Sequence, residues 1–226
     1  MSVLVELAVF NLASVAIAAD CNVPRIELCS NYSVGGVTPA FPDFIEARKL
    51  FPGKIFVMIR PRPGNFVYSD EEFESMLSEM EKFKSAGADG FVSGFLNENT
   101  AVNILQTRAF VDACAPLPVT FHRAIDECVD YNTAVANVVE CGVKRILSAG
   151  TAPSAFLGKQ MLNEVQKKYS DQLIVVAGGS VRSSGLTDFL NNSVISEVHS
   201  AAIMKAGNDV VNAEELNELI RLANVF

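Results

Sequence analysis

Residues 119–148 read VTFHRAIDECVDYNTAVANVVECGVKRILS and predict a strand, a helix and a second strand. The runs Val119–His122 and Lys144–Ser148 are short and rich in β-branched or apolar residues, as buried strands are. Between them, Tyr131–Glu140 has the apolar spacing of a helix, and Gly142 follows where a left-handed residue closes the last turn. Such a unit joins two parallel strands.

The same unit repeats along the whole chain. Six further strands are predicted at Val3–Leu7, Arg25–Leu28, Ile55–Ile59, Gly90–Ser93, Leu173–Ala177 and Ile195–His199. Further helices are predicted at Asn11–Asp20, Phe41–Leu50, Asp70–Ser85, Ala101–Ala113, Phe156–Tyr169, Gly185–Leu190 and Ala213–Ala223. Eight alternating units close most economically into a single (β/α)8 TIM-type barrel, which we expect to be one domain over residues 1–226. A doubly wound open sheet is the alternative, but its usual glycine-rich first turn is absent from Ala8–Asn11.

The composition fits a large packed core. Half of the 226 residues are hydrophobic, and 19% are charged. The formal net charge of -8 supplies no basic face, so we expect neither a nucleic-acid partner nor binding to an anionic membrane. The apolar segment Val3–Ala19 has no basic residue and is interrupted by Glu6 and Asn11, so a first strand and helix are expected there rather than a signal peptide or membrane span.

The cysteines favour free thiols in a reducing compartment. The five are Cys21, Cys29, Cys114, Cys128 and Cys141, an odd number with no Cys-x-x-Cys pair. A disulfide framework or zinc knuckle is therefore not expected, and a cytoplasmic location is. Cys29 ends the second predicted strand at the barrel mouth, so it is a candidate ligand for a soft metal.

Charged residues share the inward face of several predicted strands. In a barrel, one face of each strand packs against helices and must be apolar, while the other points inward. This alternation predicts that five residues point inward near the strand ends, where barrel active sites form. They are Glu6, Glu27, Arg60, His122 and His199. Two interpretations stay open. Glu6 and Glu27 pair with Arg60 and Arg62 and only rigidify the mouth, or the same groups build a ligand site.

The ligand-site interpretation gives five candidate catalytic residues. Glu6, Glu27, His122 and His199 are suited to proton transfer, and Asp126 would orient the His122 ring if the loop turns back. The alternative for each histidine is a structural role, capping the barrel through a backbone carbonyl. These residues also include ligand types for a divalent metal, but no spacing motif fixes a geometry.

Two cationic side chains predict binding of a small anion. Arg60 and Arg62 are each followed by proline in Arg60–Gly64, which would hold two guanidinium groups for bidentate recognition of a phosphate or carboxylate. The alternative is a surface pair that neutralises neighbouring acids.

Glycines after two strands predict further anion contacts. Gly178 and Gly179 follow the seventh strand, where backbone N–H groups hold phosphate in many barrels, and Ser180 adds a hydroxyl. Ser148 and Gly150, after the sixth strand, would extend the same site. Tight turns also use glycine routinely, so the pattern alone is weak.

Eight segments, in order along most of the chain, resemble the CutC copper homeostasis protein family. They are Arg25–Cys29, Gly35–Pro39, Ile59–Arg62, Asn65–Ser69, Thr120–Ala124 with Asp126, Arg145–Gly150, Ala177–Val181 and Glu197–Ser200. The resemblance implies a β/α barrel, a cytoplasmic location, self-association as a homo-oligomer (dimer or higher), and a role in copper homeostasis. Cysteine-based copper(I) binding has been proposed for some members.

Two functions therefore stay open at this point. The first is copper handling, with copper(I) bound at Cys29. Members often carry cysteine where this chain has Ala8 and Val9, however, and copper(I) prefers two or three soft donors. The second is an enzyme that acts on a small anionic metabolite by acid–base chemistry and affects copper tolerance only indirectly. A third interpretation, an inactive scaffold, predicts paired mouth charges with no cavity between them.

Overall fold

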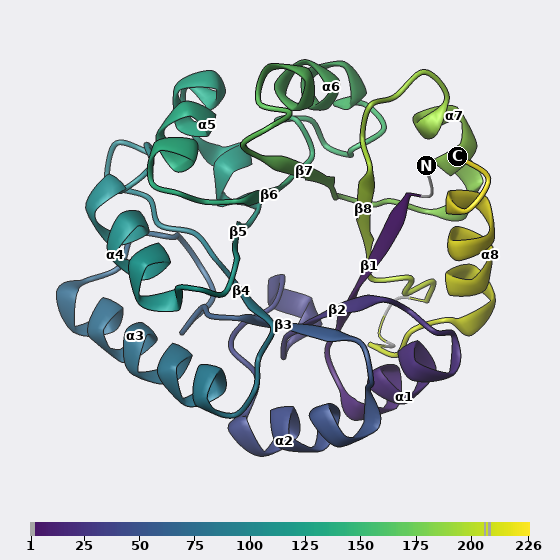
Figure 1. The fold of residues 1–226 in the computed structure, drawn as a ribbon, viewed down its shortest axis with the longest axis horizontal. Helices are drawn as coiled ribbons and strands as arrows, with labels where there is room; N and C mark the ends of the chain where they lie inside the picture. The colour runs from purple at the N-terminus through teal and green to yellow at the C-terminus, as the bar shows by residue number, and fades with distance from the viewer. Residues whose placement is uncertain (1–2, 206, 208) are drawn as a thin grey trace.

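The computed structural model describes residues 3–205, 207 and 209–226. Eight parallel strands close into a barrel in chain order, and the helices form a ring around it (Figure 1). The strands are β1 (Leu4–Val9), β2 (Arg25–Leu28), β3 (Lys54–Met58), β4 (Gly90–Ser93), β5 (Val119–Phe121), β6 (Arg145–Ser148), β7 (Ile174–Ala177) and β8 (Glu197–Ser200). The predicted TIM-type barrel is confirmed, and the open sheet is excluded because β8 pairs with β1.

The helices agree with the predicted ranges to within a few residues. They are α1 (Leu12–Asp20), α2 (Phe41–Leu50), α3 (Asp70–Ser85), α4 (Ile104–Cys114), α5 (Tyr131–Glu140), α6 (Lys159–Lys168), α7 (Ser183–Leu190) and α8 (Ala213–Ala223). α4 begins three residues later than predicted because the side chain of Asn103 accepts a hydrogen bond from the Gln106 amide and caps the helix. Two short 3-10 helices, η1 (Tyr32–Val34) and η2 (Arg123–Glu127), follow β2 and β5.

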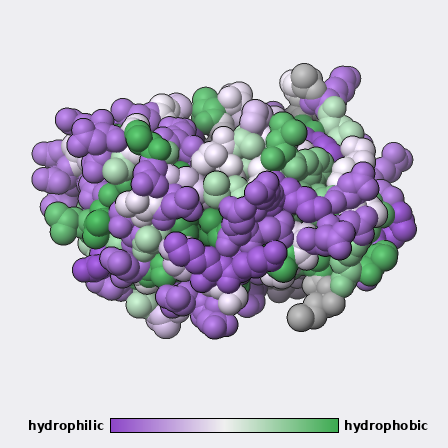
Figure 2. All heavy atoms as spheres, turned by 90° about the horizontal axis from the view of Figure 1, so that it is seen from above, coloured by the Kyte–Doolittle hydropathy of each residue, from purple (hydrophilic) through white to green (hydrophobic). Residues whose placement is uncertain are grey.

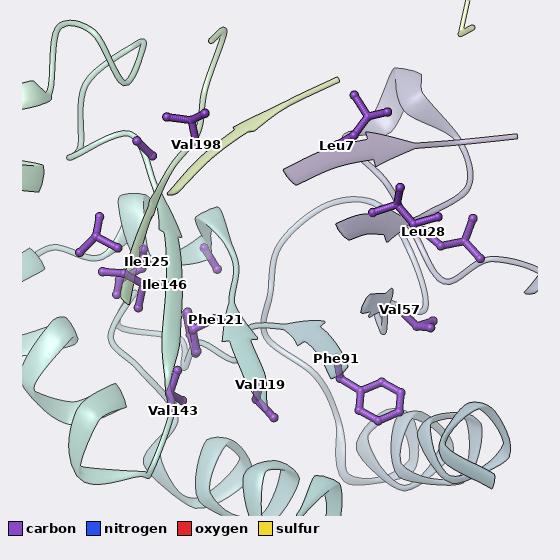
Figure 3. Close-up of a cluster of buried hydrophobic side chains, with 14 of the residues drawn as sticks. Leu7, Leu28, Val57, Phe91, Val119, Phe121, Ile125, Val143, Ile146 and Val198 are labelled. Carbon is purple, nitrogen blue, oxygen red and sulfur yellow. The ribbon is translucent and has the colours of Figure 1, made fainter. Parts of the chain in front are cut away.

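The main core lies between the strands and the helices. Leu7, Val57, Phe91 and Ile146 are fully buried members of one hydrophobic cluster, and Phe91 points from β4 toward the surrounding helices (Figure 3). These are the alternate residues of each strand, so the side chains between them must point into the barrel. The apolar packing thus fixes which residues are available for a site.

Inside the barrel, Phe56 of β3 occupies space left by a glycine. A side-chain carbon at Gly90 would lie 2.7 Å from the Phe56 ring, which is closer than real contacts allow. Glycine at the start of β4 therefore lets an aromatic ring reach across the interior.

One face of the molecule is largely polar. Figure 2 shows hydrophilic residues over most of one face, with hydrophobic residues scattered among them. Within the described ranges, no helix has both the length and the apolar character needed to cross a membrane.

Candidate active site

Two carboxylates and two guanidinium groups form a buried ion-pair layer inside the barrel. Arg25 of β2 donates hydrogen bonds to Glu6 of β1 and Glu197 of β8. Arg145 of β6 donates to the same two carboxylates. The four formal charges cancel, which offsets part of the cost of burying them. Burial alone would raise the pKa of Glu6, but a hydrogen bond from His199 and the two guanidinium charges hold it well below its usual range.

An aromatic ring lies against this layer. The guanidinium carbons of Arg25 and Arg145 lie 5.2 and 5.3 Å from the centre of the Phe56 ring. Cations at this distance are attracted to the face of an aromatic ring. The layer is therefore packed against an aromatic ring as well as hydrogen-bonded, and three of its members, Arg25, Arg145 and Glu197, are the first residues of their strands.

A cavity of about 260 Å³ opens beside this layer. Its lining includes residues that follow β2, β3, β5, β7 and β8, which places it at the carboxyl ends of the strands. Among the sequence-predicted site residues, those that line it are Glu27, Cys29, Arg60, His122, Gly179, Ser180 and His199. The inactive-scaffold interpretation predicted no cavity between the mouth charges, and the structure contradicts that expectation.

His199 connects the ion-pair layer to the cavity. The register of β1 with β8 sets it beside Glu6, and its Nδ1 lies 2.9 Å from Glu6 Oε1. Glu27 Oε2 lies 3.6 Å from the same nitrogen. Because Glu6 is ionised, Nδ1 carries the proton in this contact, and Nε2 is left for the cavity. Burial alone would lower the pKa of His199, but the nearby carboxylates Glu27 and Glu6 raise it above its ordinary value.

Glu27 and Cys29 form a second polar pair at the mouth. The Cys29 thiol donates to Glu27 Oε1 across 3.3 Å, and Glu27 Oε2 is buried without a hydrogen-bond partner. Burial raises the pKa of Glu27, and burial with the adjacent Glu27 charge raises the pKa of the Cys29 thiol well above its usual value. The pKa values of Glu27 and His199 are both raised, which favours a proton retained between these two residues.

The donor atoms of Glu6, Glu27 and His199 lie within 4.8 Å of one another, a spacing that a metal ion could bridge. The surroundings do not fit one. Glu6 already accepts from His199 through Oε1 and from two guanidinium groups through Oε2. A divalent cation here would face those guanidinium charges, so a shared proton suits the cluster better.

His122, on the other side of the mouth, is held as a neutral ring. Its Nδ1 accepts a hydrogen bond from the Ala124 amide at 3.2 Å, which places the proton on Nε2. Nε2 is buried and has no hydrogen-bond partner. Burial, with the charge of Arg60, lowers the pKa of His122 to about 3. Gly94 makes room for the ring, since a side-chain carbon there would lie 2.5 Å from Nδ1.

Arg60 lines the cavity, but its terminal nitrogens are tied to the backbone. Nη1 donates to the carbonyls of Val34 and Gly36, and Nη2 donates to the carbonyl of Gly64, all near 3 Å. Its guanidinium carbon lies 4.7 Å from the centre of the Phe66 ring. Arg60 therefore shapes the mouth and contributes positive charge, with few hydrogen bonds left for a ligand.

Arg62 lies outside the cavity. It pairs with Glu72 at the start of α3 through Nε and Nη2, the latter at 3.0 Å. The sequence-based alternative in which Glu6 and Glu27 pair with these two arginines is wrong, because Glu6 pairs with arginines of the barrel interior. The alternation of inward and outward residues holds only within a strand. Arg60 and Arg62 follow the end of β3, so it could not predict where their side chains point.

Asp126 does not contact His122. Its carboxylate accepts hydrogen bonds from the hydroxyl of Ser148 at 2.6 Å and from the amides of Ala149 and Thr151. The expectation that Asp126 orients the His122 ring is therefore wrong. η2 turns the carboxylate toward the loop after β6.

Ser148 and Gly150 belong to the same hydrogen-bond network as Asp126 and do not line the cavity. The Ser148 hydroxyl also lies 2.7 Å from the Tyr131 hydroxyl, and it accepts a hydrogen bond from the Gly150 amide at 2.9 Å. Gly178 is likewise occupied, because its amide donates to the Ser148 carbonyl. Of the predicted glycine loops, Gly179 and Ser180 are the parts that face the cavity.

Sequence reasoning missed four arginines that matter here. Arg25 and Arg145 build the interior layer, and Arg123 and Arg182 line the cavity. The signal for the first pair was present. Arg25 lies two residues before Glu27 in β2 and shares its inward phase, and Arg145 precedes the outward-facing Ile146 in β6. Arg123 and Arg182 lie beyond strand ends, where alternation gives no direction.

Comparison with known proteins identifies the family. The CutC family matches residues 3–204. The family protein CutC of Vibrio vulnificus (strain YJ016) is 35% identical over 201 residues, which cover 88% of this chain and 80% of that protein. The copper homeostasis protein cutC homolog of Drosophila melanogaster is 37% identical over 211 residues, covering 91% and 80%. A crystal structure of CutC from Streptococcus agalactiae aligns with a TM-score of 0.82 at 26% identity, covering 88% of this chain and 98% of that one. The chain therefore belongs to the CutC family, as its motifs predicted.

Proposed function

We propose that the cavity is the active site of an enzyme that acts on a small anionic metabolite by acid–base chemistry, removing a proton from it and returning one. The observation that carries this proposal is the charge of the lining. Among the described residues, Arg60, Arg123 and Arg182 line the cavity with a single carboxylate, Glu27, although the chain as a whole has a net charge of -8. A cationic cavity in an acidic protein concentrates anions.

The acid–base groups lie on two sides of this cavity and differ in protonation. His199, held through Nδ1 by Glu6, presents Nε2 to a ligand and exchanges protons together with Glu27. Neutral His122 keeps its proton on Nε2 and donates a hydrogen bond to a carbonyl oxygen of the substrate. Paired titratable groups with pKa values moved in opposite directions are typical of acid–base active sites.

Deuterium exchange tests the proposal without a known reaction. The protein is incubated in D2O with separate pools of small carboxylated and phosphorylated metabolites, and mass spectrometry follows deuterium gained at carbon. We expect exchange into at least one anionic compound, and a loss of about 100-fold or more in His199→Asn. Arg62→Gln is the control, since Arg62 lies outside the cavity. Equal exchange by wild type and His199→Asn would refute the assignment.

Copper(I) handling is the second candidate, and one observation favours it. Cys29 and Met58 pack in the same small cluster and both line the cavity, which brings a thiol and a thioether together. The name of the Drosophila relative also refers to copper homeostasis. Against it, the raised pKa of the Cys29 thiol disfavours the thiolate that copper(I) binds.

A copper(I) titration of the reduced protein against a competing chelator separates these candidates. We expect weak binding that Cys29→Ser does not change, because the thiol is neutral and hydrogen-bonded to Glu27. Cys114→Ser is the control, since Cys114 is fully buried at the end of α4. Tight one-to-one binding that disappears only in Cys29→Ser would instead establish copper handling.

We further infer a cytoplasmic location and a homo-oligomeric state for the protein. The first is supported by five free cysteines, four of them buried, which suit a reducing compartment. The second is supported by family membership.

A further inference from the structure

The loop after β7 presents a row of backbone donors that the protein does not use. Gly179 and Ser180 both have positive φ, at 108° and 56°. In residues 3–205, 207 and 209–226, the amides of Gly179, Ser180 and Val181 donate no hydrogen bond, and the Ser180 hydroxyl has no partner. All three residues line the cavity. Successive free N–H groups beside a cavity form a site for an anion.

A guanidinium group lies against this loop. A side-chain carbon placed at Gly179 would lie 3.4 Å from Arg123 Cζ and 3.5 Å from its Nη1. Arg123 Nε donates to Asp126 Oδ2 at 2.9 Å, which fixes the direction of the side chain. Its two terminal nitrogens make no hydrogen bond within the described part of the chain. Glycine at position 179 is what allows the guanidinium to approach.

The other two cavity arginines differ in this respect. Arg182 donates to the carbonyls of Val181 and Ile203, at 2.7 and 2.9 Å, and Arg60 donates to three backbone carbonyls. Arg123 therefore contributes the guanidinium whose terminal N–H groups are available to a ligand.

His122, which precedes Arg123 in the chain, offers another donor without a partner. His122 is 4% exposed, and its Nε2 has no hydrogen-bond partner although the residue lines the same cavity. A buried donor left unpaired is costly unless a bound molecule supplies an acceptor. The cavity thus offers an anion site at the β7 loop and a separate single donor for a second polar group of the same ligand.

We propose that Gly179–Val181 and Arg123 bind the phosphate group of a phosphorylated small metabolite. The inference rests on the proposed function and specifies its substrate class. Three amides, a hydroxyl and a guanidinium match the three terminal oxygens and double charge of a phosphate monoester. A carboxylate, with two oxygens and one charge, would leave several of these donors unused. Asp126 is then a positioning residue, since it holds Arg123 at the loop.

Calorimetric titration with inorganic phosphate tests this site directly. We expect saturable one-site binding to the wild type, and affinity weaker by about tenfold or more in Arg123→Gln. Arg123→Lys should keep part of the affinity because it retains the charge but loses the second terminal nitrogen. Ser180→Ala, a milder change to the loop, should weaken binding less than Arg123→Gln does. Arg62→Gln should bind phosphate like the wild type, and circular dichroism checks that each variant is folded.

The outcomes separate this inference from the proposed function. No saturable binding to the wild type, or equal binding by wild type and Arg123→Gln, would overturn the phosphate site. Deuterium exchange that His199→Asn abolishes would then still support an enzyme, acting on an anion other than a phosphate. Phosphate binding that Arg123→Gln loses, together with exchange unaffected by His199→Asn, would support the site and refute the proposed acid–base role.

Discussion

Replacing Arg145 with methionine should lower the free energy of unfolding by about 3–5 kcal/mol. Arg145 is buried and donates to the carboxylates of Glu6 and Glu197. Methionine fills much of the same volume but removes the charge, so the layer keeps one guanidinium, from Arg25, for two carboxylates. An uncompensated charge in a region of low dielectric is strongly destabilising.

Denaturant unfolding followed by circular dichroism measures this loss. The matched control is Arg221→Met, because Arg221 pairs with Glu218 on the exposed surface of α8 and the pair is screened by solvent. The control should unfold at nearly the wild-type denaturant concentration. If Arg145→Met were as stable as the control, the ion-pair layer would not hold the barrel interior together.

The barrel was predictable because strand alternation and helix spacing repeat eight times. Each strand needs one apolar face against the helices, so residues such as Val57 and Ile146 reveal the inward face of their neighbours. The same argument places Glu6, Glu27 and His199 inside the barrel, and the register of β1 with β8 brings Glu6 and His199 together.

The partners of those residues could not be derived in the same way. Alternation gives the face of a residue but not its depth, which depends on the stagger of one strand against the next. Thus Glu6 lies in one layer with Arg25, its register partner in β2, and not with Arg60, which follows β3. Beyond strand ends the backbone path is set by loops, so neither the position of Arg123 nor the contacts of Asp126 follow from the sequence pattern.

Glu6→Gln tests whether the interior layer also sets the proton affinity of the candidate site. In the wild type, the carboxylates raise the pKa of His199, so its ring keeps a proton to higher pH than an ordinary histidine. An amide removes the Glu6 charge, which is one of the causes that raise the pKa of His199, so that pKa should fall. Its NMR titration should therefore move to lower pH, and deuterium exchange should drop by about 100-fold.

The second histidine gives this experiment an internal reference. His122 has a pKa lowered to about 3 by burial and by the charge of Arg60, and Glu6 does not contact it. Its NMR signal should stay that of a neutral ring through the neutral range in both proteins. A shift of both histidines would indicate general loosening of the barrel, whereas an unchanged His199 titration would contradict the effect of Glu6 on the pKa of His199. Movement of His199 alone is expected, because Glu6 Oε1 bonds that ring while Oε2 is held by the arginines of the interior.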